Sequence, residues 1–200
     1  MFLFQPRQLV LQKSSGIGMD VLSKRKLKDL CALCHNALLE YQKVSQKAWP
    51  VLEQFANRRA ALLEINCKQD KLAEMSTEDE WSFEYLRSCI DKLAALIQQL
   101  STINAYMNGL SELVSTRSEA DSNEMALKEL GKVVDTVEDV LSSLKQDFEC
   151  KRAIVSEIGV TDSKDLVVTY LAMWLHEPCI PDSSLFYPIL LLRNMASTKT

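Results

Sequence analysis

The chain has 200 residues and a formal net charge of −4; 47% of its residues are hydrophobic and 25% are charged. This size suits one structural unit, and five glycines and five prolines are fewer than average, which favours helices. Direct nucleic-acid binding is disfavoured because it usually requires clustered Lys and Arg. No apolar run approaches the roughly 20 residues of a membrane span, and no segment fits a signal peptide. We therefore expect an intracellular protein whose cysteines are free thiols.

Residues 1–22 lack a sustained apolar period and are predicted to form a flexible leader. From Ser23 onward, apolar residues recur at two positions of a seven-residue repeat, which predicts a long coiled-coil helix. Pro50 cannot donate a backbone hydrogen bond to Gln46, so we expect a kink or a restart of this helix at Trp49. Only one residue is charged at the two repeat positions, which hold Leu27, Cys34, Tyr41, Ala48, Phe55 and Leu62, and Leu30, Ala37, Val44, Val51, Arg58 and Ile65.

A second helix is predicted to begin after a polar connection and to run to about Val114. Ser76 or Thr77, followed three residues later by Asp79 or Glu80, matches a capping signal. The repeat of this helix is apolar at every position: Leu86, Cys89, Leu93, Leu96, Leu100, Ile103, Met107, Leu110 and Val114. Four of these residues are expected to form the inner seam of the bundle: Leu93, Leu96, Leu100 and Ile103.

A third helix is predicted after a polar turn at residues 115–123. Its apolar repeat consists of Leu127, Leu130, Val134, Val137, Leu141, Leu144, Phe148, Val155 and Ile158, with Lys151 as the one charged residue in register. Gly159 stands where a left-handed, helix-ending residue is wanted. A short fourth helix, residues 164–176, is predicted between a cap at residues 161–163 and Pro178. It has almost no polar face, so we expect it to be covered nearly all round.

These elements predict an all-α fold, an elongated antiparallel bundle or coiled coil of three long helices with a short C-terminal helical cap. Residues 23–159 would form the bundle and residues 160–200 the cap and tail, with residues 185–194 as one more candidate helix. Three such helices bury only part of their apolar stripes on each other. A partner helix is therefore expected.

One short motif suggests chemistry. Cys31-Ala32-Leu33-Cys34-His35 matches the C-x-x-C-H pattern of haem attachment. Cys34, however, occupies a core position of a long helix, and one C-x-x-C pair supplies too few ligands for zinc. His35 and His176 are the two histidines, and no glycine-rich phosphate loop occurs. We therefore expect no catalytic residue, no cofactor and no metal.

Two tripeptides fit the docking pattern for a cyclin groove. One holds Arg7 and Leu9 in the predicted leader; the other holds Arg25 and Leu27, although Leu27 is also the first core position of the bundle.

The apolar fourth helix has two interpretations. It is either a hydrophobic cap folded back over the end of the rod or an anchor for a partner, because Trp is frequent at binding hot spots. As an anchor, its docking patch would be Met173, Trp174 and Leu175.

Residues near both ends of the chain form a recognisable pattern. The first group is Arg25-Lys26-Leu27-Lys28-Asp29 with His35-Asn36; the second is Lys151-Arg152, Asp165-Leu166 and Tyr170-Leu171-Ala172-Met173-Trp174-Leu175-His176-Glu177-Pro178. In order and spacing they resemble the cyclin-dependent-kinase-2-interacting protein family. Pro50 and the residues after Cys179 depart from the family pattern.

The resemblance implies a non-catalytic nuclear adaptor or scaffold. Such a protein would bind cyclin-dependent kinase and cyclin, replication-licensing factors and the interacting subunit of the checkpoint kinase in DNA replication, the cell cycle and the DNA damage checkpoint. With a helical partner subunit, it would also join a complex of AAA+ ATPases linked to replisome protein turnover and ribosome maturation. The heptads alone leave an alternative, a purely structural coiled-coil tether or cytoskeletal linker.

Overall fold

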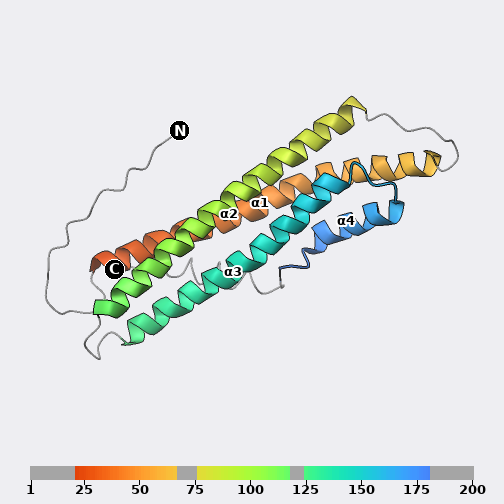
Figure 1. Ribbon diagram of the computed structural model, residues 1–200. Helices are drawn as coiled ribbons and strands as arrows, with labels where there is room; N and C mark the ends of the chain where they lie inside the picture. Colours follow the sequence, from red (N-terminus) through yellow and green to blue (C-terminus); the bar gives the residue numbers. More distant parts are fainter. Residues whose placement is uncertain (1–20, 67–75, 118–123, 181–200) are drawn as a thin grey trace.

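The computed structural model describes residues 21–66, 76–117 and 124–180. They form four helices: α1 (Val21–Asn66), α2 (Thr77–Arg117), α3 (Glu124–Glu157) and α4 (Lys164–His176). Figure 1 shows α1, α2 and α3 side by side in a long rod, with α4 alongside one end of it. The predicted all-α antiparallel architecture is confirmed, and the predicted bounds of the fourth helix match those of α4. Residues 1–20 of the predicted leader and the candidate helix at residues 185–194 lie outside the described residues. The last two residues of the predicted leader, Val21 and Leu22, belong to α1.

The four helices surround a shared core in cyclic order. Helix α2 packs against α1 and α3, and α4 also packs against α1 and α3. In the described part of the chain, no Cα of α1 lies within 8 Å of a Cα of α3. Helices α1 and α3 therefore stand diagonally opposite each other where α4 is present, and contact between them depends on long side chains.

Helix α1 continues through its proline, so of the two predicted alternatives, a kink or a restart at Trp49, the restart is wrong. Pro50 lies inside the helix on its exposed side, where water can satisfy the Gln46 carbonyl that loses its donor. Ala48 and Leu52 on either side of the proline are fully buried. Core packing before and after Pro50 thus holds the helix in place across the missing hydrogen bond.

The apolar repeats supply most of the core. Helices α1 and α3 each bury one additional row of residues, spaced by seven, beyond the two repeat positions that were predicted. Because a bundle helix contacts two neighbours, its buried stripe is wider than a two-position seam. The additional buried rows are Cys31, Leu38, Ser45 and Leu52 on α1, and Val133, Val140, Asp147 and Ile154 on α3.

The end of α3 differs from the prediction. In the described residues no glycine has a positive φ, so Gly159 is not left-handed. The Glu157 carbonyl instead accepts hydrogen bonds from the N–H groups of Val160 and Thr161, both at 3.0 Å. The residue that adopts the left-handed conformation in this part of the chain is Glu177, with φ 43°, at the end of α4.

A polar cluster joins the start of α2 to α1, and it explains the charged residue in the α1 repeat. Arg58 Nε donates to Asp79 Oδ1 at 2.7 Å, and Arg58 also donates to Ser82 Oγ at 2.9 Å. Ser76 Oγ accepts from the Asp79 N–H and donates to Asp79 Oδ2, as the capping signal predicts. Burial by itself raises the pKa of Asp79, but hydrogen bonds from Arg58 and Ser76 outweigh burial and lower it.

Replacing Asp79 with Asn should destabilise the protein by about 1 kcal/mol at pH 7, because the neutral amide weakens the charge-assisted hydrogen bond from Arg58. Because folding lowers the pKa of Asp79, its carboxylate stabilises the fold fully above the unfolded value of about 3.9 and loses this effect as pH falls through the folded value. Urea unfolding of wild type and Asp79→Asn should therefore converge below about pH 4. Glu80→Gln, an exposed first-turn control, should change little; an Asp79→Asn deficit that is independent of pH contradicts the role of the carboxylate.

Candidate interaction site: helix α4 on a buried lysine cluster

The charged residue in the α3 repeat organises a buried cluster. Lys151 is fully buried, and its Nζ donates to Asp147 Oδ2 and Glu177 Oε1, both at 2.6 Å. Asp147 lies one turn before Lys151 on α3, whereas Glu177 follows α4 directly. One ammonium therefore ties the end of α4 to the inside of α3. We call Lys151, Asp147, Glu177, Tyr41 and Ser45 the lysine cluster.

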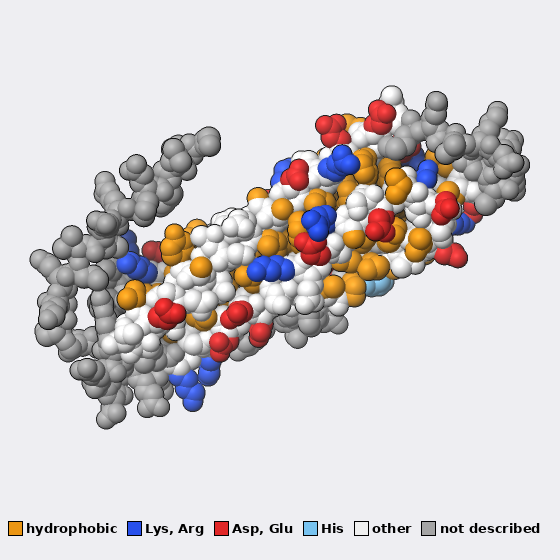
Figure 2. Space-filling view, in the orientation of Figure 1, with side chains coloured by type: hydrophobic (Ala, Val, Ile, Leu, Met, Phe, Trp, Pro, Cys, Tyr) orange, Lys and Arg blue, Asp and Glu red, His pale blue; other side chains and the backbone are white. Residues whose placement is uncertain are grey.

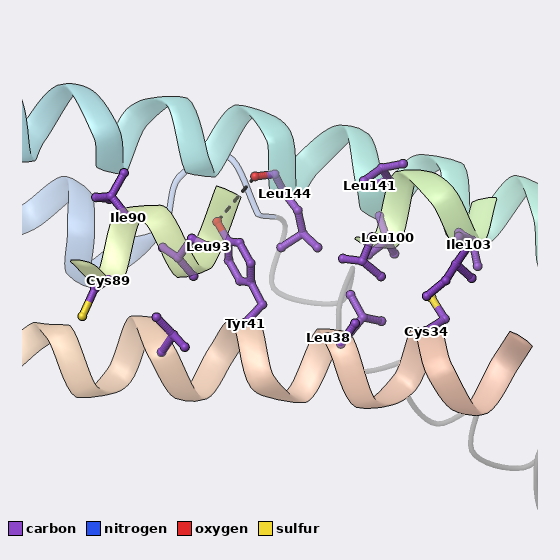
Figure 3. Packing of buried hydrophobic residues seen from close by; sticks show 14 of the residues in the cluster. Cys34, Leu38, Tyr41, Cys89, Ile90, Leu93, Leu100, Ile103, Leu141 and Leu144 are labelled. Atoms are coloured by element: carbon purple, nitrogen blue, oxygen red, sulfur yellow. Dashed lines mark hydrogen bonds between the residues drawn. The ribbon is translucent and has the colours of Figure 1, made fainter. Parts of the chain in front are cut away.

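Helix α1 supplies the two remaining members of the lysine cluster. The Tyr41 hydroxyl donates to Asp147 Oδ2 at 2.7 Å and approaches the Leu144 carbonyl at 3.5 Å, the contact drawn in Figure 3. Ser45 Oγ donates to Glu177 Oε1 at 3.1 Å. Burial raises the pKa of Tyr41, and the nearby Asp147 carboxylate raises it further, so the hydroxyl stays protonated as a donor. The cluster thereby joins three helices, including the diagonal pair α1 and α3.

Two aromatic rings flank the ammonium of Lys151. Its Nζ lies 5.6 Å from the centre of the Tyr41 ring and 5.5 Å from that of the Trp174 ring. Contact with aromatic faces favours a cation that has lost its water. Trp174 is 2% exposed, so its ring lies in the interior with the lysine.

The other end of α4 is also fastened to the rod. Ser163 caps the helix by accepting a hydrogen bond from the Leu166 N–H. Arg59 of α1 donates to the Thr161 carbonyl at 2.9 Å, and Lys164 pairs with Glu64 of α1. With the lysine cluster at its carboxyl end, α4 is held at both ends.

Although α4 is fastened firmly, most of its apolar surface stays open, so the prediction that it is covered nearly all round is wrong for the described residues. Val167 and Trp174 are its buried residues. Two apolar rows, each spaced by seven residues, flank this buried face: Val168 with Leu175, and Leu166 with Met173. Their exposed fractions are 56% and 57% for the first row, and 44% and 36% for the second. We call these four residues the α4 flanks.

The residues predicted to form the docking patch therefore separate. Met173 and Leu175 belong to the α4 flanks, whereas Trp174 points into the core and contacts Lys151. The reason is geometric, because three consecutive residues of a helix point in directions about 100° apart.

The predicted inner seam lies in the bundle interior. Leu93, Leu100 and Ile103 are buried, and Leu96 is partly buried against the core. Figure 3 shows Leu93, Leu100 and Ile103 directed between α1 and α3.

The two tripeptides with the cyclin-groove pattern differ in placement. Arg25 is exposed on the first turns of α1, but Leu27 is 5% exposed and packs in the core, so this leucine is not presented to a partner. Arg7 and Leu9 lie outside the described residues.

The cysteines of the C-x-x-C-H motif lie in the core. Cys31 and Cys34 are free and buried, and burial raises the pKa of Cys31 to about 11 and that of Cys34 to about 12. Among the described residues, no three His, Cys, Asp or Glu side chains are grouped so that they could hold a metal ion. None of the described helices combines the length and apolar character of a membrane span.

The sequence patterns did not predict that the members of the lysine cluster meet. Lys151 stood out as a charge in an apolar register, but its partners did not. Asp147 could have been found from its position four residues before Lys151, the spacing of an ion pair on one helix. Ser45 and Glu177 carry no such signal, because their proximity depends on how α4 folds back.

These features define an elongated antiparallel helical bundle with exposed apolar side chains on a fastened fourth helix. No family model matches the chain. It is 25% identical over 179 residues to the cyclin-dependent kinase 2-interacting protein of Mus musculus, covering 82% of this chain and 84% of that protein. The corresponding proteins of Homo sapiens and Xenopus laevis are 24% and 22% identical, covering 82% and 80% of this chain and 84% and 83% of their own lengths. The chain is thus a distant homologue of cyclin-dependent kinase 2-interacting proteins along most of its length, which confirms the resemblance.

The structure gives a physical reason for part of that resemblance. Of the residues that carry it near the carboxyl end, Lys151, Trp174 and Glu177 meet in one place, although Lys151 lies on a different helix from Trp174. Their shared role is to hold α4 against the rod.

Replacing Lys151 with Met should destabilise the protein by about 3–5 kcal/mol, because Asp147 is left as a buried charge without its cation. Urea unfolding followed by circular dichroism measures the loss. Arg152→Met is the matched control, since Arg152 is the next residue and pairs with Glu149 on the exposed surface; it should change stability little. Equal stability of Lys151→Met and wild type contradicts the proposed contribution of the cluster.

Alkylation should distinguish the core thiols from those near α4. Iodoacetamide at pH 8 should modify Cys150 and Cys179, which are partly exposed, well before Cys31 and Cys34, whose burial and raised pKa suppress the reactive thiolate. Peptide mass spectrometry over time reports each site, and unfolding in urea should make all four react. Similar rates for all four in the native protein would show that the C-x-x-C pair is accessible.

Proposed function

We propose that this chain is a non-catalytic interacting protein that associates with cyclin-dependent kinase 2 and uses the α4 flanks as a docking surface. The observation that carries the proposal is the exposure of four large apolar side chains on a helix that is held at both ends. A fastened helix loses little conformational freedom when a partner binds it, so more of the contact energy contributes to affinity. Cyclin-dependent kinase 2 is the partner stated in the names of the proteins to which this chain is similar.

The proposal extends to the setting that the resemblance implies. The chain would act in the nucleus as a scaffold. Its partners would be cyclin-dependent kinase with cyclin, and replication and checkpoint factors that include the checkpoint kinase-interacting subunit. It would also bind AAA+ ATPases that act in ribosome maturation and replisome protein turnover. A helical partner subunit laid along one row of the α4 flanks would bury side chains that the described residues leave exposed. Helix against helix is the packing mode that an apolar row spaced by seven residues supports.

The docking surface can be tested without disturbing the core. Val168→Gln/Leu175→Gln should keep the helicity and thermal midpoint of wild type, because both side chains are more than half exposed, and should weaken binding to purified cyclin-dependent kinase 2 with cyclin by about tenfold or more. Leu33→Gln/Leu113→Gln changes two equally exposed leucines on α1 and α2 and should bind normally. Affinity is measured by surface plasmon resonance with the full chain immobilised.

Two results would contradict parts of this proposal separately. If wild type binds no kinase, the proposed partner is wrong; if Val168→Gln/Leu175→Gln binds like wild type, the row of Val168 and Leu175 is not the docking surface. Affinity purification of the full chain from nuclear extract tests the wider setting, and recovery of neither kinase nor AAA+ ATPase opposes it. A stable homo-oligomer that captures no other subunit would favour the structural tether.

A further inference from the structure

An aromatic pair lies near the start of α2, far from the lysine cluster along the chain; its first member, Trp81, is exposed, and its second, Tyr85, is partly buried against the core. Trp81 is 62% exposed, and its ring stacks on that of Tyr85 with 5.7 Å between centroids and 19° between planes. Leaving an indole this exposed forgoes the burial of one of the largest apolar side chains. Core packing accounts for Tyr85, which lies against the buried cluster, but Trp81 is not among the side chains packed against that cluster.

Carboxylates surround the pair at the spacings that place residues side by side on a helix. Glu78 precedes Trp81 by three residues and Glu84 follows it by three. Both are exposed, and neither has an ion-pair partner among the described residues. Figure 2 shows acidic side chains at the end of the rod where α2 begins.

Two arginines that lie near the start of α2 contact other groups. Asp79, also in the first turn, is already paired with Arg58. Arg87 lies over the ring of Phe83, 4.6 Å from its centre. Glu78 and Glu84 therefore lie beside the exposed Trp81 ring without an ion-pair partner among the described residues.

We infer that Trp81, Tyr85, Glu78 and Glu84 form a second docking surface, and that it receives an arginine-bearing segment of a protein partner. A guanidinium stacks on an indole or phenol face and donates paired hydrogen bonds to a carboxylate, so one side chain can use both features of this surface. The negative charge selects a basic segment and opposes an acidic one. An aromatic surface without carboxylates would favour an apolar partner instead.

The same helix provides an internal comparison. Tyr106 is 65% exposed, and no acidic residue lies within four positions of it. It thus matches Trp81 in exposure and belongs to the same helix, but it has no carboxylates beside it. If exposure of an aromatic ring were sufficient for the interaction, Tyr106 would serve equally well.

The test uses the full chain labelled with 5-fluorotryptophan and an eight-residue peptide of alternating Arg and Gly. The fluorine resonance of Trp81, assigned with Trp81→Phe, should shift on titration, whereas those of Trp49 and Trp174 should stay in place. Calorimetry should show binding weakened about threefold or more by Trp81→Ala and by Glu78→Gln/Glu84→Gln, since each removes one of the two attractions. Tyr106→Ala and the Val168→Gln/Leu175→Gln variant should bind the peptide like wild type.

The inference fails if the Trp81 resonance does not move, if Trp81→Ala binds as tightly as wild type, or if Tyr106→Ala weakens binding equally. A peptide with Glu in place of Arg should not bind, and if it does, charge does not select the partner. Because the readout involves neither kinase nor the α4 flanks, its result is independent of the proposed function.

Discussion

The position of α4 depends on one buried cation. Lys151 lies in an apolar register of α3, where a charge without partners would be very unfavourable. Asp147 and Glu177 supply those partners at 2.6 Å, and Tyr41 and Ser45 bind the same two oxygen atoms. Because Glu177 belongs to the segment after α4, the lysine is fully compensated only when α4 is docked. Docking of α4 and burial of the charge are therefore one event.

This coupling also explains an unusual backbone. Glu177 is the non-glycine residue with a positive φ in the described part of the chain, at φ 43° and ψ 59°. Such a conformation is unfavourable for a residue with a Cβ, and glycine is the common choice at this position of a helix end. The carboxylate that glycine would lack is the one that reaches Lys151 and Ser45. The ion pair with Lys151 thus offsets the conformational cost of the left-handed backbone at Glu177. A charged side chain therefore fixes the end of α4, where many helices instead use the flexible backbone of a glycine.

The division of surfaces on α4 gives the bundle its proposed role. A single helix cannot turn all of its apolar residues toward a rod, and α4 turns Val167 and Trp174 inward while its flanks remain exposed. The firm attachment makes those flanks a preformed surface. The aromatic pair on α2 differs in kind, because its carboxylates select a charged partner, whereas the α4 flanks present hydrophobic contacts. Two surfaces of different chemistry on one rigid rod suit a protein that holds two partners.

Much of this architecture follows from local pattern. Helix α4, its Ser163 cap, the Ser76 cap of α2 and the apolar seams from Leu86 to Val114 are encoded by residues a few positions apart, so the sequence by itself determined them. Tertiary structure decided the rest: packing carried α1 through Pro50, the diagonal placement of α1 and α3 buried a third row on each, and the fold brought Tyr41, Lys151 and Glu177 together across more than a hundred residues. It also separated Trp174 from Met173 and Leu175. Periodicity reports which face of a helix is apolar, but which neighbour covers that face depends on contacts that no local spacing contains.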